Sequence, residues 1–104
     1  MITADPILQQ FRAALTELYG DRIERVVLYG SRARGDARPD SDYDIALFLN
    51  GPVDTWQELD PIVAIQLASL DATGADIHTI PLSAESWTKR TPLMHEIRKD
   101  GRDI

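Results

Sequence analysis

Two aspartates in the first half of the chain are spaced so that they can bind cations together. Asp42 and Asp44 lie at the start of the apolar segment 43–49. Side chains alternate along a strand, so both carboxylates would share one face, roughly 6–7 Å apart. At an effective dielectric constant near 20, two negative charges at that separation repel by about 2–3 kcal/mol. Divalent cations would reverse this repulsion, and Mg²⁺ prefers such oxygen ligands. The alternative is a pair of solvated residues at a strand end.

A glycine–serine turn precedes this pair. Gly30 and Ser31 follow the short apolar stretch 25–29, which predicts a strand that ends at Gly30. Glycine allows a ligand to approach the main chain closely, and a helix that begins at Ser31 would present free N–H groups to a phosphate. Three arginines that follow can add charge-assisted contacts to the same anion: Arg32, Arg34 and Arg38. A purely steric turn is the alternative. The neighbouring aspartates favour the phosphate site.

A third acidic residue lies in the segment 75–80, which predicts another strand stopped by Pro81. On such a strand Asp76 and His78 share a face. Asp76 can serve as the general base that deprotonates an attacking hydroxyl, or it can be a turn residue after Gly74, and spacing alone favours neither. His78 can be a metal ligand or a proton carrier. We favour a packed or partly solvated histidine, which is the more common situation on a strand.

The helices that position these residues follow from caps and apolar spacing. Asp5 and Pro6 predict a helix start, and Gly20 predicts its end. A second long helix is expected over 57–70, closed by Gly74, and Pro61 either starts it or kinks it. Apolar residues expected to face inward from this second helix are Leu59, Ile62, Val63, Leu67 and Leu70.

The last part of the chain predicts two short helices, capped by Ser83 and by Thr91, the second ending near Gly101. Helices and strands therefore alternate along the chain. This order predicts a single α/β domain over residues 1–104, with a small central sheet flanked by helices.

Composition limits the classes of protein. The net charge is −6, with a pI near 4.7, which argues against sequence-independent binding of nucleic acid. The chain has no cysteine, so disulfides and thiolate metal sites are excluded. No apolar run reaches the roughly 18 residues of a membrane span, and the first residues lack the features of a signal peptide. We expect a cytoplasmic protein.

Other conspicuous residues receive a structural interpretation. Trp56 and Trp87 can stack on a nucleobase, but we favour core or interface positions for both. The mixed charges of 95–102 predict a solvated helix face.

The pattern Gly30-Ser31-Arg32-Ala33-Arg34-Gly35, followed by Ser41-Asp42-Tyr43-Asp44, resembles the signature of the polymerase-β-like nucleotidyltransferase superfamily. Within it, nearly the whole chain resembles the minimal nucleotidyltransferases, the MNT family. The resemblance implies a nucleotidyltransferase fold with a mixed sheet and ATP as substrate. Its implied nucleotide-binding residues are Gly30, Ser31 and Arg34. Its implied catalytic residues, which would also hold two Mg²⁺ ions, are Asp42, Asp44 and Asp76.

The same resemblance implies a partner. Members of the family commonly act as antitoxins that attach AMP to a tyrosine of a small helical ribonuclease toxin of the HEPN type. The alternative is a catalytically idle module that neutralises a partner by covering it, although a pure binding module gains nothing from close anionic pairs. Transfer to a small molecule is disfavoured, because the chain has no residues for a separate acceptor domain.

Overall fold

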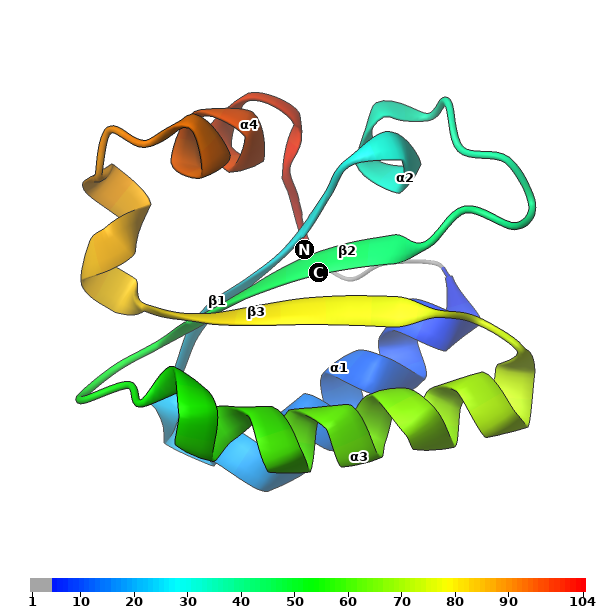
Figure 1. Ribbon diagram of the computed structural model, residues 1–104, viewed down its shortest axis with the longest axis horizontal. Helices are drawn as coiled ribbons and strands as arrows, with labels where there is room; N and C mark the ends of the chain where they lie inside the picture. Colours follow the sequence, from blue (N-terminus) through cyan, green and yellow to red (C-terminus); the bar gives the residue numbers. More distant parts are fainter. Residues whose placement is uncertain (1–4) are drawn as a thin grey trace.

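The computed structural model describes residues 5–104 as a four-stranded sheet with helices on both faces (Figure 1). The strand order is β3-β2-β1-β4, with β1 at Ile23–Tyr29, β2 at Tyr43–Leu49, β3 at Ile77–Ser83 and β4 at Arg102–Asp103. Strand β1 is antiparallel to β2 and β4, whereas β2 and β3 are parallel. The predicted mixed sheet is confirmed. The prediction that no signal peptide is present concerns the first residues, most of which lie outside the described residues.

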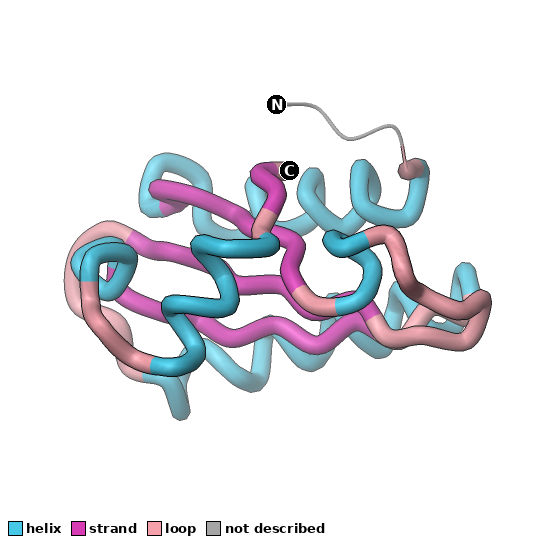
Figure 2. The backbone as a smooth tube through the Cα atoms, turned by 90° about the horizontal axis from the view of Figure 1, so that it is seen from above, coloured by secondary structure: helices cyan, strands magenta, loops and turns pink. Residues whose placement is uncertain are grey.

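The two faces of the sheet carry different helices. Helices α1 (Pro6–Tyr19) and α3 (Thr55–Thr73) cover one face, while α2 (Ser31–Arg34) and α4 (Pro92–Asp100) lie over the other (Figures 1 and 2). Two short 3₁₀ helices, η1 (Gly20–Arg22) and η2 (Ala84–Thr88), connect neighbouring elements. Alternate residues of β2 enter different cores, as predicted: Tyr43, Ile45, Leu47 and Leu49 pack with α1 and α3, and Ala46 and Phe48 pack with α4.

The predicted caps of helices α1 and α4 are confirmed. The Asp5 carboxylate accepts the Ile7 N–H at 2.9 Å at the start of α1, and Gly20 follows its last residue. At α4, the Thr91 hydroxyl accepts the Met94 N–H at 3.1 Å. Each bond satisfies a backbone donor that the first helical turn leaves free.

The predicted inward face of α3 is wrong for most of its residues. Ile62 is fully buried, but Val63, Leu67 and Leu70 are exposed. Half-buried Ile65 and Gln66 lie toward the sheet instead, and the Gln66 side chain accepts the Thr79 N–H of β3 at 2.8 Å. The helix is apolar on nearly all sides, so apolar spacing did not define its orientation.

Helix α3 also begins before Pro61. Its N-cap is Asp54, whose carboxylate accepts the N–H groups of Trp56 and Gln57, and Pro61 lies inside the helix. The alternative that Pro61 starts the helix is therefore wrong. The predicted end at Gly74 is confirmed by its left-handed backbone, with φ of 76°.

The predicted stop of β3 at Pro81 is also wrong, because β3 continues to Ser83. Proline has no backbone N–H to donate to a neighbouring strand. Because β3 is an edge strand, the sheet tolerates a proline there. Strand β4 was not predicted; its two residues pair with Val27 and Leu28 of β1. Within residues 5–104, none of the helices combines the length and apolar character that crossing a membrane requires.

Candidate active site

The strand register brings three segment ends to one end of the sheet. Strand β1 ends there, while β2 and β3 begin there, because Tyr29 pairs with Asp44 and Asp44 pairs with His78. A backbone hydrogen bond of 2.9 Å from the Tyr43 N–H to the Asp76 carbonyl extends this pairing beyond the strands. The glycine turn, the aspartate pair and the third aspartate, which are distant in sequence, therefore meet.

Gly30 lies directly against Asp44. Its backbone has φ of 74° and ψ of −157°, a conformation that side chains disfavour. A Cβ atom at this position would lie 2.5 Å from Asp44 Oδ2. The predicted short helix begins at Ser31, directly after this glycine. The absence of a side chain at Gly30 therefore keeps open the space in front of the Asp44 carboxylate.

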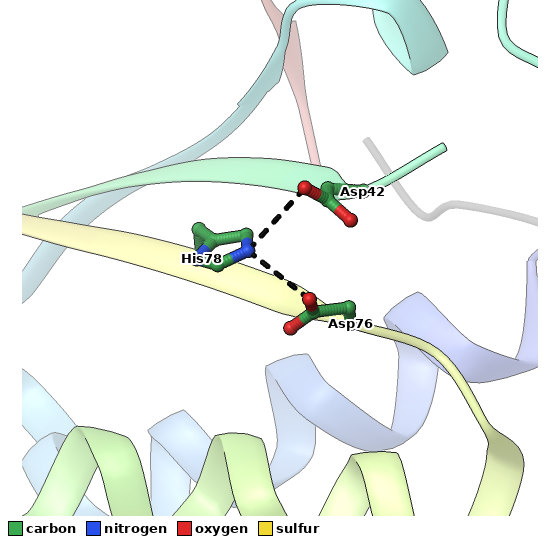
Figure 3. Close-up of side chains that lie close together, drawn as sticks. All are labelled: Asp42, Asp76 and His78. Carbon is green, nitrogen blue, oxygen red and sulfur yellow. Dashed lines mark ion pairs between the residues drawn. The ribbon is translucent and has the colours of Figure 1, made fainter. Parts of the chain in front are cut away.

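Asp42, Asp76 and His78 form a second group beside Asp44 (Figure 3). His78 Nε2 lies 3.4 Å from Asp42 Oδ2 and 3.4 Å from Asp76 Oδ2. The three side chains are about half exposed, between 51% and 55%. His78 is thus partly solvated, as one of the interpretations predicted, but it is not packed. It contacts two of the three predicted catalytic aspartates.

Asp44 is more enclosed than the other two aspartates. Burial raises its pKa above the usual value, and the Asp42 and Glu96 carboxylates add to this rise, while His78 and Arg34 oppose it. The neighbouring Tyr29 has its pKa raised to about 12 by burial and by the Asp44 and Glu96 charges. The site is therefore short of positive charge. A divalent cation would supply it.

Glu96 also influences Asp44 and Tyr29, and the sequence analysis did not predict it as part of the site. It lies on α4 within the mixed-charge run, whose charged residues are exposed as predicted, apart from the partly buried Asp100. Its effect on Asp44 and Tyr29 places its charge close to the site. No spacing pattern connects Glu96 to residues some fifty positions earlier, so only the packing of α4 reveals it.

The arginines of the turn differ in their contacts. Arg32 donates from Nε and Nη2 to the Ser41 carbonyl at 3.0 and 2.8 Å, and its guanidinium stacks on the Tyr43 ring at 4.1 Å. Arg32 therefore holds the loop that carries Asp42.

Arg34 instead faces carboxylates. Its Nε lies 3.2 Å from Asp36 Oδ2, and its Nη1 lies 3.9 Å from Asp100 and 4.0 Å from Glu96. Its side chain is 40% exposed, so these are weak surface pairs.

The residues present fit a divalent metal. Ligand atoms of Asp42, Asp76 and His78 all lie within 4.8 Å of one another, and Asp44 extends from the same face of β2 as Asp42. Carboxylate oxygens are the ligands that Mg²⁺ and Mn²⁺ take in proteins.

The tryptophans lie elsewhere. Trp87 packs edge-on against Phe48 with ring centroids 5.5 Å apart, and Arg25 stacks on it at 4.0 Å, which agrees with a structural role. Trp56 is 82% exposed, so a core position is wrong for it.

Comparison with known proteins defines the class. Residues 8–96 match the family model of the nucleotidyltransferase domain, and the chain belongs to this family. It is similar to two candidate protein adenylyltransferases of Methanocaldococcus jannaschii. One is 31% identical over 94% of this chain and 95% of the relative. The other is 34% identical over 80% of this chain and 77% of the relative.

Solved structures share the fold. A candidate nucleotidyltransferase from Sulfolobus solfataricus aligns with a TM-score of 0.66 and 19% identity, covering 93% of this chain and 75% of its own. A complex of the Shewanella oneidensis HEPN toxin, tri-AMPylated, with an MNT antitoxin aligns with a TM-score of 0.54 and 17% identity, covering 91% and 69%. These likenesses show that the chain shares the fold of both structures.

Proposed function

We propose that this protein transfers AMP from ATP to a tyrosine hydroxyl of a HEPN-type partner protein and so acts as its antitoxin. The observation that carries the proposal is the meeting of Gly30, Asp42, Asp44 and Asp76 at one end of the sheet. Support for AMP comes from the two relatives described as candidate protein adenylyltransferases. Support for the partner comes from the complex of an MNT antitoxin with a HEPN toxin.

The triphosphate would bind at the turn after β1. Gly30 has no side chain between its backbone and Asp44, so phosphates can approach both closely. Ser31 would contribute its hydroxyl and the first N–H group of α2. Arg34, which now pairs with the carboxylates of Asp36, Glu96 and Asp100, would turn to the phosphates, which form strong bidentate contacts with a guanidinium.

Asp42, Asp44 and Asp76 would hold two divalent ions, with Mg²⁺ as the expected metal. Bound metal of this kind stabilises charge on both the attacking and the leaving oxygen of an in-line displacement. The raised pKa of Asp44 supports this assignment, because a carboxylate with its pKa raised by burial and by neighbouring anions gains most from a cation.

The order of strands suggests the direction of the reaction. Gly30 follows β1, Asp42 precedes and Asp44 lies on central β2, and Asp76 precedes edge strand β3. Pyrophosphate would leave on the β1 side, and the acceptor hydroxyl would attack from the β3 side. Asp76 would take the proton of the hydroxyl as its oxygen forms a bond to the α-phosphorus. The bond from that phosphorus to the oxygen bridging to the β-phosphate breaks.

Transfer of radioactive label from ATP tests the proposal. The protein is co-expressed with a HEPN-type protein, and the purified pair is incubated with ATP labelled at the α- or the γ-phosphate. We expect the α-label, and not the γ-label, to appear on the HEPN-type protein, with hydrolysis and mass spectrometry locating it on tyrosine.

Matched variants distinguish catalysis from binding. Asp42→Asn should abolish labelling, whereas Asp40→Asn, which changes an exposed aspartate of the preceding loop, should not. Transfer of the γ-label would show a kinase instead. If the HEPN-type protein is inhibited equally by wild type and Asp42→Asn without labelling, the protein acts only by covering its partner.

A further inference from the structure

We propose that His78 is itself a metal ligand, so that one divalent ion is held by two carboxylate oxygens and one imidazole nitrogen. This inference rests on the proposed function and adds to it the identity of a ligand and a preference among metals. Its three ligands would be Asp42, Asp76 and His78, which come from the starts of two parallel strands.

The two separations that involve His78 match those of ligands around one ion. Metal–oxygen and metal–nitrogen bonds of about 2.1 Å place neighbouring ligand atoms roughly 3.0 Å apart in octahedral and 3.4 Å apart in tetrahedral geometry. Nε2 of His78 lies 3.4 Å from one oxygen of each aspartate. A charge-assisted hydrogen bond would be shorter, at about 2.7–2.9 Å. The imidazole is therefore placed as a ligand would be, with small movements needed to close on an ion.

The placement of His78 is set by the sheet rather than by a flexible side chain. His78 pairs with Asp44 across β2 and β3, so its ring extends from the same face as the aspartates. Figure 3 shows the ring directed between the two carboxylates. All three side chains are about half exposed, so an ion can enter without unfolding. Within residues 5–104, this is the one group of three or more such side chains close enough to share an ion.

A nitrogen ligand changes which metals bind best. Mg²⁺ prefers an octahedral set of oxygens, whereas imidazole favours later transition metals such as Co²⁺, Ni²⁺ and Zn²⁺. We therefore expect this position to bind Mn²⁺ and Co²⁺ more tightly than Mg²⁺. Replacing His78 should remove much of that preference.

Pulsed electron paramagnetic resonance of bound Mn²⁺ tests ligation directly. The protein has two histidines, and His95 is exposed on α4, so His95→Gln is a matched control for His78→Gln. The protein is produced with ¹⁵N-labelled histidine and loaded with Mn²⁺ alone, which avoids the nitrogens of adenine. We expect a ¹⁵N coupling in wild type and His95→Gln that is absent in His78→Gln.

Calorimetry measures the preference of the site among divalent metals. His78→Gln should weaken Co²⁺ binding on the order of tenfold or more while changing Mg²⁺ affinity by less than about twofold. Mn²⁺ that binds without a ¹⁵N coupling would overturn the role of His78 and leave the proposed transfer reaction standing. Absence of Mn²⁺ binding in the wild type, with and without ATP, would overturn both.

Discussion

The two faces of the sheet divide stability and chemistry between them. Among residues 5–104, thirteen buried residues form one continuous core on the α1 and α3 side, with Ala33 of α2 reaching into it. On the other side the described core has six buried residues, and the helices above it are short, α2 having 4 residues and α4 having 9. The thinner covering leaves the aspartates at one end of β2 and β3 open to solvent. Under the proposed function, substrate would reach them without disturbing the larger core.

Strand β2 shows the same division residue by residue. Tyr43 and Ile45 are buried on the α1 and α3 side. Asp42, directly before the strand, and Asp44, between these two residues, lie on the opposite side, which α2 and α4 cover only partly. A change at one residue should thus affect either folding or transfer, and a change at its neighbour should affect the other. The following experiments test this separation.

The largest effect is expected from Gly30→Ala. The added Cβ would lie 2.5 Å from Asp44 Oδ2 and would occupy the space that phosphates need, so we expect loss of measurable ATP binding in calorimetry. Gly51→Ala is the control, because Gly51 has a similar φ of 80° with nothing within 4 Å of the added atom. If both variants bind ATP equally, Gly30 is only a turn residue.

Asp76→Asn should lower the rate of transfer by about 10²–10⁴-fold, the usual loss when a general base is removed. Affinity for ATP should fall much less, because the phosphates are assigned to the turn at Gly30 and to Asp42 and Asp44. The measurement is labelled transfer to the HEPN-type protein together with ATP binding by the same variant. Near-normal transfer would mean that Asp76 is a turn residue and not the base.

Phe11→Ala tests the opposite face. Phe11 on α1 is 2% exposed, and truncating a buried phenylalanine costs about 3–5 kcal/mol of stability. Urea unfolding should show this loss, while transfer per folded molecule stays near that of wild type. A variant that is fully folded yet inactive would show that the two faces are coupled.

The smallest effect concerns alkaline pH. Burial raises the pKa of Tyr19 on one face, and raises that of Tyr29 on the other face to about 12. A tyrosine with a raised folded-state pKa contributes stability below its unfolded pKa of about 10, and this contribution is lost as pH rises toward the folded value. The loss is about 1.4 kcal/mol per pH unit for each residue.

Tyr19→Phe and Tyr29→Phe should each flatten this decline between pH 10 and about 12. Urea unfolding at several alkaline pH values measures it. A decline as steep as in wild type would mean that neither hydroxyl is as enclosed as the structure indicates.

Local patterns predicted turns, caps and strand faces better than they predicted packing. The turn at Gly30, the shared face of Asp42 and Asp44, and the caps at Asp5 and Thr91 depend on neighbouring residues. These features follow from local backbone geometry, so they can be predicted from the sequence.

The features that could not be predicted from the sequence depend on contacts between distant segments. The contact of His78 with Asp42 needs the parallel register of β2 and β3, and the nearness of Glu96 needs α4 to pack on the sheet. The orientation of α3 was missed because apolar residues occur on nearly all its sides, leaving Val63, Leu67 and Leu70 exposed. Strand β4 has 2 residues, too few for any alternation to appear.

Calorimetry of Asp44→Asn with Mg²⁺ and ATP, alongside urea unfolding, tests most directly whether the open end of the sheet holds the chemistry. Asp44 is the aspartate whose pKa burial and neighbouring anions raise, so removing its charge relieves repulsion in the metal-free protein. We predict that binding of the Mg²⁺–ATP complex is lost while the free energy of unfolding is unchanged or increased. Equal affinity in Asp44→Asn and wild type would contradict the assignment of this carboxylate to the metal.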